Sequence, residues 1–371
     1  MKIVPFIVLL VLALVSFYKI NALNYTKTKQ INESIVKHPE NLPTKETARN
    51  STFWFANLRA DLYWLQAIQY IGGNAISSDY KRYLYTMLDL ITELNPYFDH
   101  PYIIGQLLLP SYNQRYEDLS QEEQDLNTQQ AVDLGKKWIE NFCDPEKLEL
   151  VKNEYNLNKL WSEEQYQNTC KDADIAFKLA YIYQYYLHDG LTASYYYKVA
   201  SVSKNALDWA KVMTAIMQWK GWDREKSFFM FLNMASTVEQ NDQVCIDFSN
   251  QLNALALNWQ LKNDTLTIQT IEKTRKEIFP QKTDDNADGL GDAECSSFLN
   301  KAIRELNLSY IEEGHNKYLE THDEPLYNAQ ELLEEWYIDF LPTDPQQWKD
   351  YWIIYTYNDD IGRFDYEMWR Y

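Results

Sequence analysis

The stretch from residue 173 to residue 236 repeats itself at a nearly constant spacing. Corresponding positions are Leu179, Tyr183, Ala193, Tyr197 and Ala200 in the first copy and Val212, Ile216, Ser227, Phe231 and Met234 in the second. The offset between the copies is 33 residues in the leading helical segment and 34 in the trailing one. A period near 34 residues with two helical segments per unit predicts helix pairs stacked into a helical solenoid. Such folds provide binding surfaces rather than preformed reaction centres.

Composition favours helix over sheet and excludes one class of partner. Hydrophobic residues make up 46% and aromatic residues 15% of the 371 residues, and there are only 10 glycines. A chain of this kind can bury a sizeable core and favours helices. We therefore expect a mainly α fold. The formal net charge is −19, from 54 acidic and 35 basic side chains. Because so acidic a surface repels phosphate backbones, we also expect that the chain does not bind nucleic acid.

The N-terminus carries an uninterrupted, mostly apolar run over residues 3–18, with Lys2 before it and Lys19 after it. The run is short for a membrane span, which needs about 17–25 residues, and it is similar in length to the apolar part of a signal peptide. No clear small-x-small cleavage site follows, so a transmembrane anchor over residues 1–20 is favoured over a cleaved signal. The rest of the chain would then be extracytoplasmic, touching the membrane through the N-terminal helix only. The polar residues 21–50 predict a linker.

Helical spacing resumes after the linker. The first predicted helix covers residues 53–70, where Leu58, Leu62, Leu65, Ile68 and Gln69 follow helical spacing. Further helices are expected over residues 80–94, 102–109 and 129–142, with residues 110–127 as a charged insertion before the last of them. Gly105 is expected where two helices approach closely.

The repeated region itself predicts two helical hairpins, over residues 176–187, 192–201, 207–219 and 224–235, and a third pair over residues 243–260 and 265–279. In the helix predicted over residues 207–219, the apolar residues follow i, i+3, i+4, i+7 and i+8, which predicts a fully buried stripe. The residues of this stripe are Trp209, Val212, Met213, Ile216 and Met217.

Residues 53–279 resemble tetratricopeptide-repeat proteins. The best matches to the size pattern of that repeat are Leu179, Ala180, Tyr183, Ala193, Tyr197 and Ala200. The resemblance implies an α–α superhelix of antiparallel helix pairs over residues 51–280, with a groove that takes a protein or peptide partner. The motif is degenerate and insertions interrupt it, so repeat number and register stay open.

The four cysteines allow three pairings. We expect disulfides Cys143–Cys170 and Cys245–Cys295, because each would close a sequence-local loop around polar, insertion-like residues. An exported location also favours oxidation. The alternative is four buried free thiols. The chain has no C-x-x-C pair and only five histidines, so a zinc site is not expected.

Residues 284–295 place oxygen-bearing side chains at positions 1, 3, 5 and 9 of a loop, with glycine at position 6. Hard cations take six to eight oxygen ligands, and the glycine permits the sharp turn that presents them. The segment resembles calcium loops of the D-x-N-x-D-G type, including thrombospondin type 3 repeats. The resemblance implies Ca2+ ligation by Asp284, Asn286, Asp288, Leu290 (through its carbonyl), Asp292 and Glu294. Cys295 replaces the bidentate acid, which implies weak affinity; a solvated acidic loop over residues 281–297 is the open alternative.

Residues 298–371 predict a small α+β module. A helix over residues 298–319, a short helix over 330–336 and strands over 351–357 and 363–369 follow one another, with a turn between the strands. This order of helix, proline-bearing loop and hairpin resembles a module of pseudopilin-like exported proteins, in which glycine would stand at the position of Trp336. The N-terminus lacks a pilin processing site, so the chain is not itself a pilin.

The sequence contains no convincing catalytic set. The sequence has no G-x-S-x-G nucleophile motif, no H-E-x-x-H zinc motif, no phosphate-binding Walker loop and no dinucleotide-binding G-x-G-x-x-G motif. The acidic pairs Glu163-Glu164 and Glu334-Glu335 are expected on solvated faces. We therefore expect no enzymatic activity and a membrane-anchored, extracytoplasmic scaffold for protein–protein interaction in envelope, secretion or pilus assembly. One alternative is a cell-surface α/α-type glycan-active enzyme, which needs two carboxylates about 5–10 Å apart. The other is a purely structural surface protein.

Overall fold

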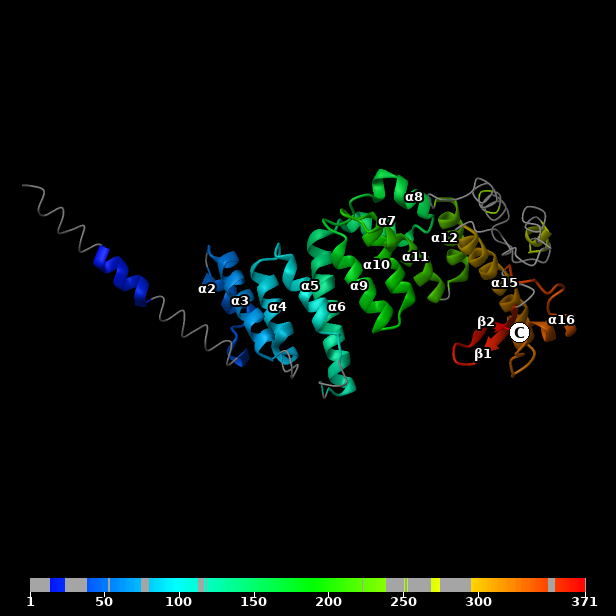
Figure 1. Ribbon diagram of the computed structural model, residues 1–371, viewed down its shortest axis with the longest axis horizontal. Helices are drawn as coiled ribbons and strands as arrows, with labels where there is room; N and C mark the ends of the chain where they lie inside the picture. The colour runs from blue at the N-terminus through cyan, green and yellow to red at the C-terminus, as the bar shows by residue number, and fades with distance from the viewer. Residues whose placement is uncertain are drawn as a thin grey trace, which may run out of the picture. The chain divides into compact units, whose positions relative to one another are not determined.

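The computed structural model is mainly α-helical, and the only sheet among the described residues is a two-stranded hairpin near the C-terminus (Figure 1). This confirms the expected mainly α fold with a small α+β module at the C-terminal end. The described residues are 14–23, 39–52, 54–74, 80–112, 117, 119–221, 223–237, 250, 252, 268–273, 295–345 and 351–370. The chain divides into two compact units, Met1–Phe142 and Cys143–Tyr371.

The N-terminal apolar run is only partly described. Residues 14–23 are helical, and their side chains are exposed. The remainder of the predicted anchor lies outside the described residues. Within the part of the chain that the structure describes, no helix is both long enough and apolar enough to span a bilayer. The anchor over residues 1–20 stays a prediction.

In the first unit, helix α4 is central and contacts the other helices. After a 3-10 turn at Pro39–Asn41, the helices are α2 (Lys45–Thr52), α3 (Ala56–Asn74), α4 (Lys81–Leu94), α5 (Asp99–Leu108) and α6 (Gln121–Phe142). The apolar residues Leu84, Leu88 and Ile91 of α4 are fully buried. A Cβ at Gly105 of α5 would lie 2.3 Å from Cδ1 of Leu134 on α6. The close helix approach predicted at this glycine is therefore confirmed.

The leucines that give α3 its helical spacing are not on its buried face. Leu58, Leu62, Leu65 and Ile68 are between 36% and 57% exposed. The buried side chains of α3 are Ala60, Tyr63, Gln66, Ala67 and Tyr70. The two small alanines allow close packing, so this face is the one that contacts the other helices. Helix α3 therefore has apolar residues on two faces, and described residues cover one of them.

Helix α6 begins at Gln121, so the predicted insertion over residues 110–127 is wrong in its C-terminal part. The first turns of the helix are polar, and they begin with a capping box. The amide of Ser120 donates to Oε2 of Glu123 at 2.9 Å, and the amide of Glu123 donates to Oγ of Ser120 at 3.3 Å. These reciprocal bonds satisfy amides at the helix start, where no intrahelical acceptor exists.

The second unit contains the repeated helices side by side (Figure 1). Its first elements are α7 (Pro145–Asn153), α8 (Leu157–Ser162), the 3-10 turn Glu164–Tyr166, α9 (Asp174–Tyr185), α10 (Gly190–Val202), α11 (Asp208–Lys220) and α12 (Arg224–Thr237). A Cβ at Gly190 would lie 2.6 Å from the backbone nitrogen of Gly221, so this glycine lets α10 and α11 meet closely. The packed helix pairs are compatible with a helical solenoid. The third predicted pair lies largely outside the described residues.

The C-terminal part of the second unit consists of α15 (Cys295–Leu319), α16 (Ala329–Glu334), β1 (Tyr351–Asn358) and β2 (Arg363–Arg370). The strands pair antiparallel, with Tyr351 opposite Arg370 and Asn358 opposite Arg363. Gly362 in the turn has a φ of 66°, which glycine adopts without steric cost. The predicted hairpin is confirmed, and α15 joins it to α12 by packing along both.

Trp336 follows α16 in a left-handed backbone conformation, with a φ of 64°. Its amide donates to the carbonyl of Leu333 at 3.2 Å, and the amide of Tyr337 donates to the carbonyl of Leu332 at 2.9 Å. This pair of bonds is the Schellman arrangement, in which the left-handed residue is usually glycine. The position has the backbone of a glycine and a side chain that is 86% exposed.

Candidate functional site

An apolar surface lies on one side of α9 and α11, and we call it the α9–α11 face. It consists of Phe177, Tyr181, Tyr185, Trp209, Val212, Met213 and Ile216. The rings of Phe177 and Trp209 join the two helices, with centroids 4.3 Å apart. The rings of Tyr181 and Tyr185 lie 4.3 Å apart on α9. These contacts make the aromatic residues of both helices parts of one surface.

The α9–α11 face is open, so the prediction of a fully buried stripe on α11 is wrong. Trp209 is 52% exposed, and Tyr181 and Tyr185 are 41% and 53% exposed. Val212, Met213 and Ile216 are partly exposed, whereas Met217 is buried. The side chains that α11 buries are Ala210, Thr214, Ala215, Met217 and Gln218. These mostly small side chains pack toward α10, where Oγ of Ser194 donates to the carbonyl of Thr214 at 2.8 Å.

The insertion over residues 143–170 packs on the trailing helices α10 and α12. From α10, the ammonium of Lys198 donates to three carbonyl oxygens within residues 151–154, each at 2.9 Å. From α12, Oδ1 of Asn233 accepts a hydrogen bond from the amide of Leu157 at 2.6 Å. The inserted helices α7 and α8 therefore leave the leading helices α9 and α11 uncovered on their apolar side.

The contact of Lys211 also shows that α8 lies away from the apolar side of α11. The ammonium of Lys211 lies 5.3 Å from the ring centroid of Trp161 in α8, within the range of a cation–π contact. Two residues correspond to a rotation of about 200° around an α-helix, so Lys211 and Trp209 point to nearly opposite sides. Helix α8 and the α9–α11 face thus flank α11 on different sides.

The predicted disulfide Cys143–Cys170 is confirmed. Cys170 is buried, and its amide donates to Oγ of Ser203 at 3.2 Å, which fixes the closed loop at the C-terminal end of α10. Cys245 and the side chain of Cys295 lie outside the described part of the structure. The second pairing stays a prediction.

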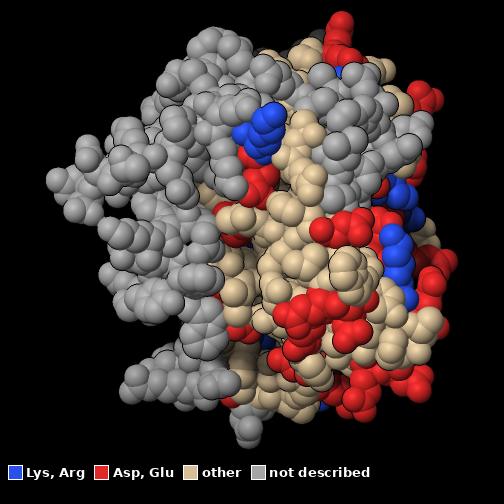
Figure 2. Space-filling model, turned by 90° about the vertical axis from the view of Figure 1, so that its right-hand side faces the viewer, with Lys and Arg blue, Asp and Glu red and all other residues tan. Residues whose placement is uncertain are grey.

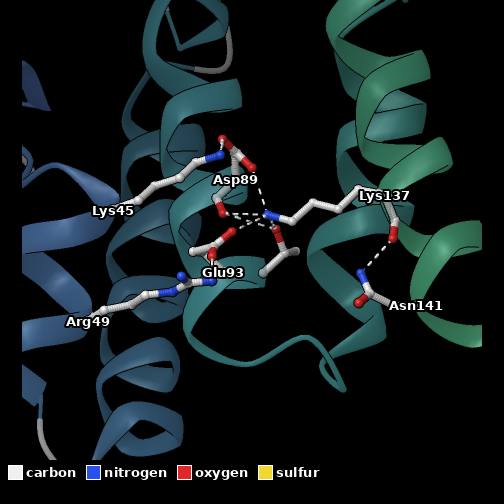
Figure 3. Close-up of polar contacts among 7 residues, drawn as sticks. Lys45, Arg49, Asp89, Glu93, Lys137 and Asn141 are labelled. Atoms are coloured by element: carbon white, nitrogen blue, oxygen red, sulfur yellow. Dashed lines mark hydrogen bonds and ion pairs between the residues drawn. The ribbon is translucent and has the colours of Figure 1, made fainter.

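A cluster of charged side chains in the first unit joins α2 and α6 to α4 (Figure 3). Asp89 and Glu93 lie one turn apart on α4, and the ammonium of Lys137 is 2.7 Å from Oδ1 of Asp89 and 3.2 Å from Oε2 of Glu93. From α2, Lys45 pairs with Asp89 at 2.5 Å, and Arg49 pairs with Glu93. Both carboxylates are engaged by two cations each, so the cluster holds helices together rather than providing an acid and a base for catalysis.

Two buried arginines hold the C-terminal part of the second unit together. Arg224, at the start of α12, pairs with Glu305 at 3.1 Å and with Glu312 at 3.0 Å, both on α15. Arg304 of α15 donates two hydrogen bonds to Asp344, at 2.7 and 3.0 Å. Burial raises the pKa of Glu305 to about 7, although Arg224 acts in the opposite direction. These pairs are 81, 88 and 40 residues apart in the chain, so no local pattern indicates them.

The outer surface near the C-terminus is acidic. Figure 2 shows Asp and Glu side chains spread over the described surface of this end, with fewer Lys and Arg. Exposed acidic residues here include Glu320, Asp323, Glu331, Glu334, Glu335 and Asp360. Such a surface is unfavourable for binding to a phosphate backbone.

The acidic pairs that the sequence indicates lie at the surface, and the predicted calcium ligands are not among the described residues. Glu164, Glu334 and Glu335 are exposed and Glu163 is partly exposed. Among the described residues, no three or more His, Cys, Asp and Glu side chains come together as a metal site. The predicted calcium ligands Asp284, Asn286, Asp288, Leu290, Asp292 and Glu294 lie outside the described residues.

Comparisons with protein families, with curated proteins and with solved structures find no match to this chain.

Proposed function

We propose that this chain is a membrane-tethered, extracytoplasmic helical scaffold that binds a protein partner through the α9–α11 face. The observation that carries the proposal is the exposure of three aromatic rings, Tyr181, Tyr185 and Trp209, on one surface. Tyrosine and tryptophan are enriched at the centres of protein interfaces, because they bury much area with few rotatable bonds.

The surroundings of the face support this role. The rings are mounted on α9 and α11, whose other sides are packed on α10, so the surface is held in place before a partner arrives. The disulfide-closed insertion lies on α10 and α12. In the tetratricopeptide-repeat proteins that the sequence resembles, the helix pairs form a groove that takes peptides, and we assign the same class of partner to the α9–α11 face.

Tether and calcium are further parts of the proposal. The apolar run over residues 3–18 would keep the scaffold at the outer side of a membrane, with the polar residues between this run and α2 as a spacer. The loop over residues 284–295 would bind Ca2+ weakly. Titration calorimetry of the purified chain with millimolar CaCl2 tests the loop, and the absence of both heat and a thermal shift would exclude it.

Site-specific photo-cross-linking in the source cells tests the α9–α11 face. A photoreactive amino acid replaces Met213 on the face or, as a control, the exposed Leu150 of α7 in the same unit. We expect a discrete cross-linked partner from position 213 and none from position 150. In the same cells, Trp209→Ala/Tyr185→Ala should reduce the cross-link about tenfold or more, since truncating an interface anchor costs about 2 kcal/mol or more.

The matched control is Leu150→Ala, which truncates an exposed apolar side chain outside the face. It should leave the cross-link at position 213 unchanged. Equal labelling from positions 213 and 150, or an unchanged cross-link in the Trp209→Ala/Tyr185→Ala variant, would contradict the assignment of the face.

A further inference from the structure

Helix α3 in the first unit presents an apolar ridge that no described residue covers, and we call it the α3 ridge. It consists of Trp54, Phe55, Leu58, Leu62, Leu65 and Ile68. Trp54 and Phe55, just before the helix, are 95% and 67% exposed. The leucines follow at i, i+4 and i+7, so they line one side of the helix. A ridge of this length exposed to water indicates a surface that another apolar surface covers.

The charges around the α3 ridge argue against a lipid surface as its occupant. A helix that lies in a membrane interface carries Lys and Arg along its polar side. Helix α3 has one basic residue, Arg59, and its guanidinium donates to Oγ of Ser51 at 2.7 Å and to the hydroxyl of Tyr63 at 3.0 Å. The exposed Asp61 lies beside the leucines and would be repelled by anionic headgroups.

The two ends of α3 have complementary shapes. Trp54 and Phe55 are bulky, whereas a Cβ at Gly72 or Gly73 would meet no atom within 4 Å. If two copies pair antiparallel about a two-fold axis between residues 63 and 64, residue 54 faces residue 73 and residue 55 faces residue 72. The same axis places Leu62 opposite Leu65. Each bulky end then meets an open end, as a self-complementary two-fold contact requires.

We propose that the α3 ridge is a homodimer interface in which two copies of the chain pack their α3 helices antiparallel. The 19 residues of α3 make a face about 28 Å long. With a width of about 15 Å, roughly 400 Å² per chain is buried, which is below the area of a stable dimer and gives a weak, reversible one. Tethering two copies to one membrane would raise their local concentration and offset this weakness.

Sedimentation equilibrium of the full chain in mild detergent, up to about 300 µM, tests the proposal. The wild-type chain is expected to form dimers in a concentration-dependent manner. Leu62→Glu/Leu65→Glu puts four carboxylates into the interface and should weaken the dimer by a factor of about ten or more. The control Leu107→Glu/Leu126→Glu adds the same charge at exposed leucines of α5 and α6 and should dimerise like the wild type.

A charge-swapped variant reports the direction of pairing. In Leu62→Lys/Leu65→Glu, antiparallel pairing brings each lysine opposite a glutamate of the second copy, so the dimer is retained. Parallel pairing would place like charges together, and the dimer would be lost. All substitutions are at exposed positions, and unchanged melting temperatures verify that each variant folds.

Three results would overturn the proposal: a monomeric wild-type chain at the highest concentration, a Leu62→Glu/Leu65→Glu variant that associates like its control, or a charge-swapped variant that does not dimerise. Association through the N-terminal apolar run would be common to all variants. It therefore cannot imitate an effect of the α3 ridge. The face on α9 and α11 is untouched by these substitutions, so failure here is independent of the proposed function.

Discussion

Removing the Cys143–Cys170 disulfide is expected to lower the free energy of unfolding of the second unit by about 3.5 kcal/mol. The two cysteines are 27 residues apart in the chain. In the chain-entropy description, a loop of this length restricts the unfolded state by about 12 cal/mol/K, which is about 3.5 kcal/mol at about 25 °C. The variant is Cys143→Ala/Cys170→Ala, which removes the bond with a small change in side-chain volume.

Native-state hydrogen exchange read by mass spectrometry separates the two units. The most protected amides of α10, in the second unit, should lose about 3.5 kcal/mol of opening free energy, whereas those of α4, in the first unit, should not change. Reducing the wild-type chain should have the same effect. If α10 keeps its protection to within about 1 kcal/mol, the disulfide does not constrain the unfolded state in the way that its loop length implies.

The same measurement tests the second cysteine pair. Adding reductant to the Cys143→Ala/Cys170→Ala variant can act only on a remaining disulfide. A further loss of protection in α15 would support the predicted Cys245–Cys295 bond. No further loss would favour free thiols at these two positions.

Three further predictions concern single residues of the second unit. Trp336→Gly should stabilise the second unit by about 1 kcal/mol, because a left-handed residue with a Cβ costs about 1–2 kcal/mol and the larger backbone entropy of glycine in the unfolded state offsets part of this gain. Chemical denaturation measures the change in stability, and Trp336→Ala should give a smaller one. An equal gain in both variants would contradict the backbone argument. Gly190→Ala should destabilise by about 2 kcal/mol, because its Cβ would lie 2.6 Å from the backbone nitrogen of Gly221; an unchanged melting temperature would show that the helices can separate without cost. Burial raises the pKa of Glu305 from its ordinary 4.5 to about 7, so the folded state holds a proton more tightly than the unfolded state between these values. The free energy of unfolding should therefore fall as pH rises through this window. Denaturation curves between about pH 4.5 and 7.5 should show this pH dependence for the wild-type chain and not for Glu305→Gln, and the same pH dependence in both would refute the prediction.

Local sequence patterns predicted the repeated helices and the hairpin, but not α2, α7 and α8, which lie in segments interpreted as a linker and an insertion. The hairpin was readable because alternating residues flank a turn with Gly362, whose φ of 66° suits glycine. The offset of 33 and 34 residues located α9 to α12. The early start of α6 was missed because its polar first turns resemble a loop in composition, although Ser120 and Glu123 have the spacing of a capping box.

Which face of a helix is covered could not be predicted from the sequence. Apolar spacing on α3 and α11 indicated stripes of leucines and aromatic residues, yet the buried faces combine alanines such as Ala60 and Ala210 with polar or larger side chains such as Gln66. Alanines permit close helix contacts and polar side chains can be buried when they are hydrogen-bonded, whereas hydrophobic periodicity is dominated by large apolar residues. The buried ion pairs of Arg224 and Arg304 were also missed, because their partners are distant in the chain.

Arg224 also depends on a residue that is made much later. Its guanidinium donates to the carbonyl of Phe364 at 2.5 Å, across 140 residues of chain. At about 5–20 residues per second, synthesis reaches that acceptor roughly 7–30 s after residue 224 has been added. Over this interval α12 carries a cation whose full set of acceptors does not yet exist, and burying it would be unfavourable. The repeated helices can therefore assemble while the nascent chain is still growing, but the second unit closes only after residue 364 has been added.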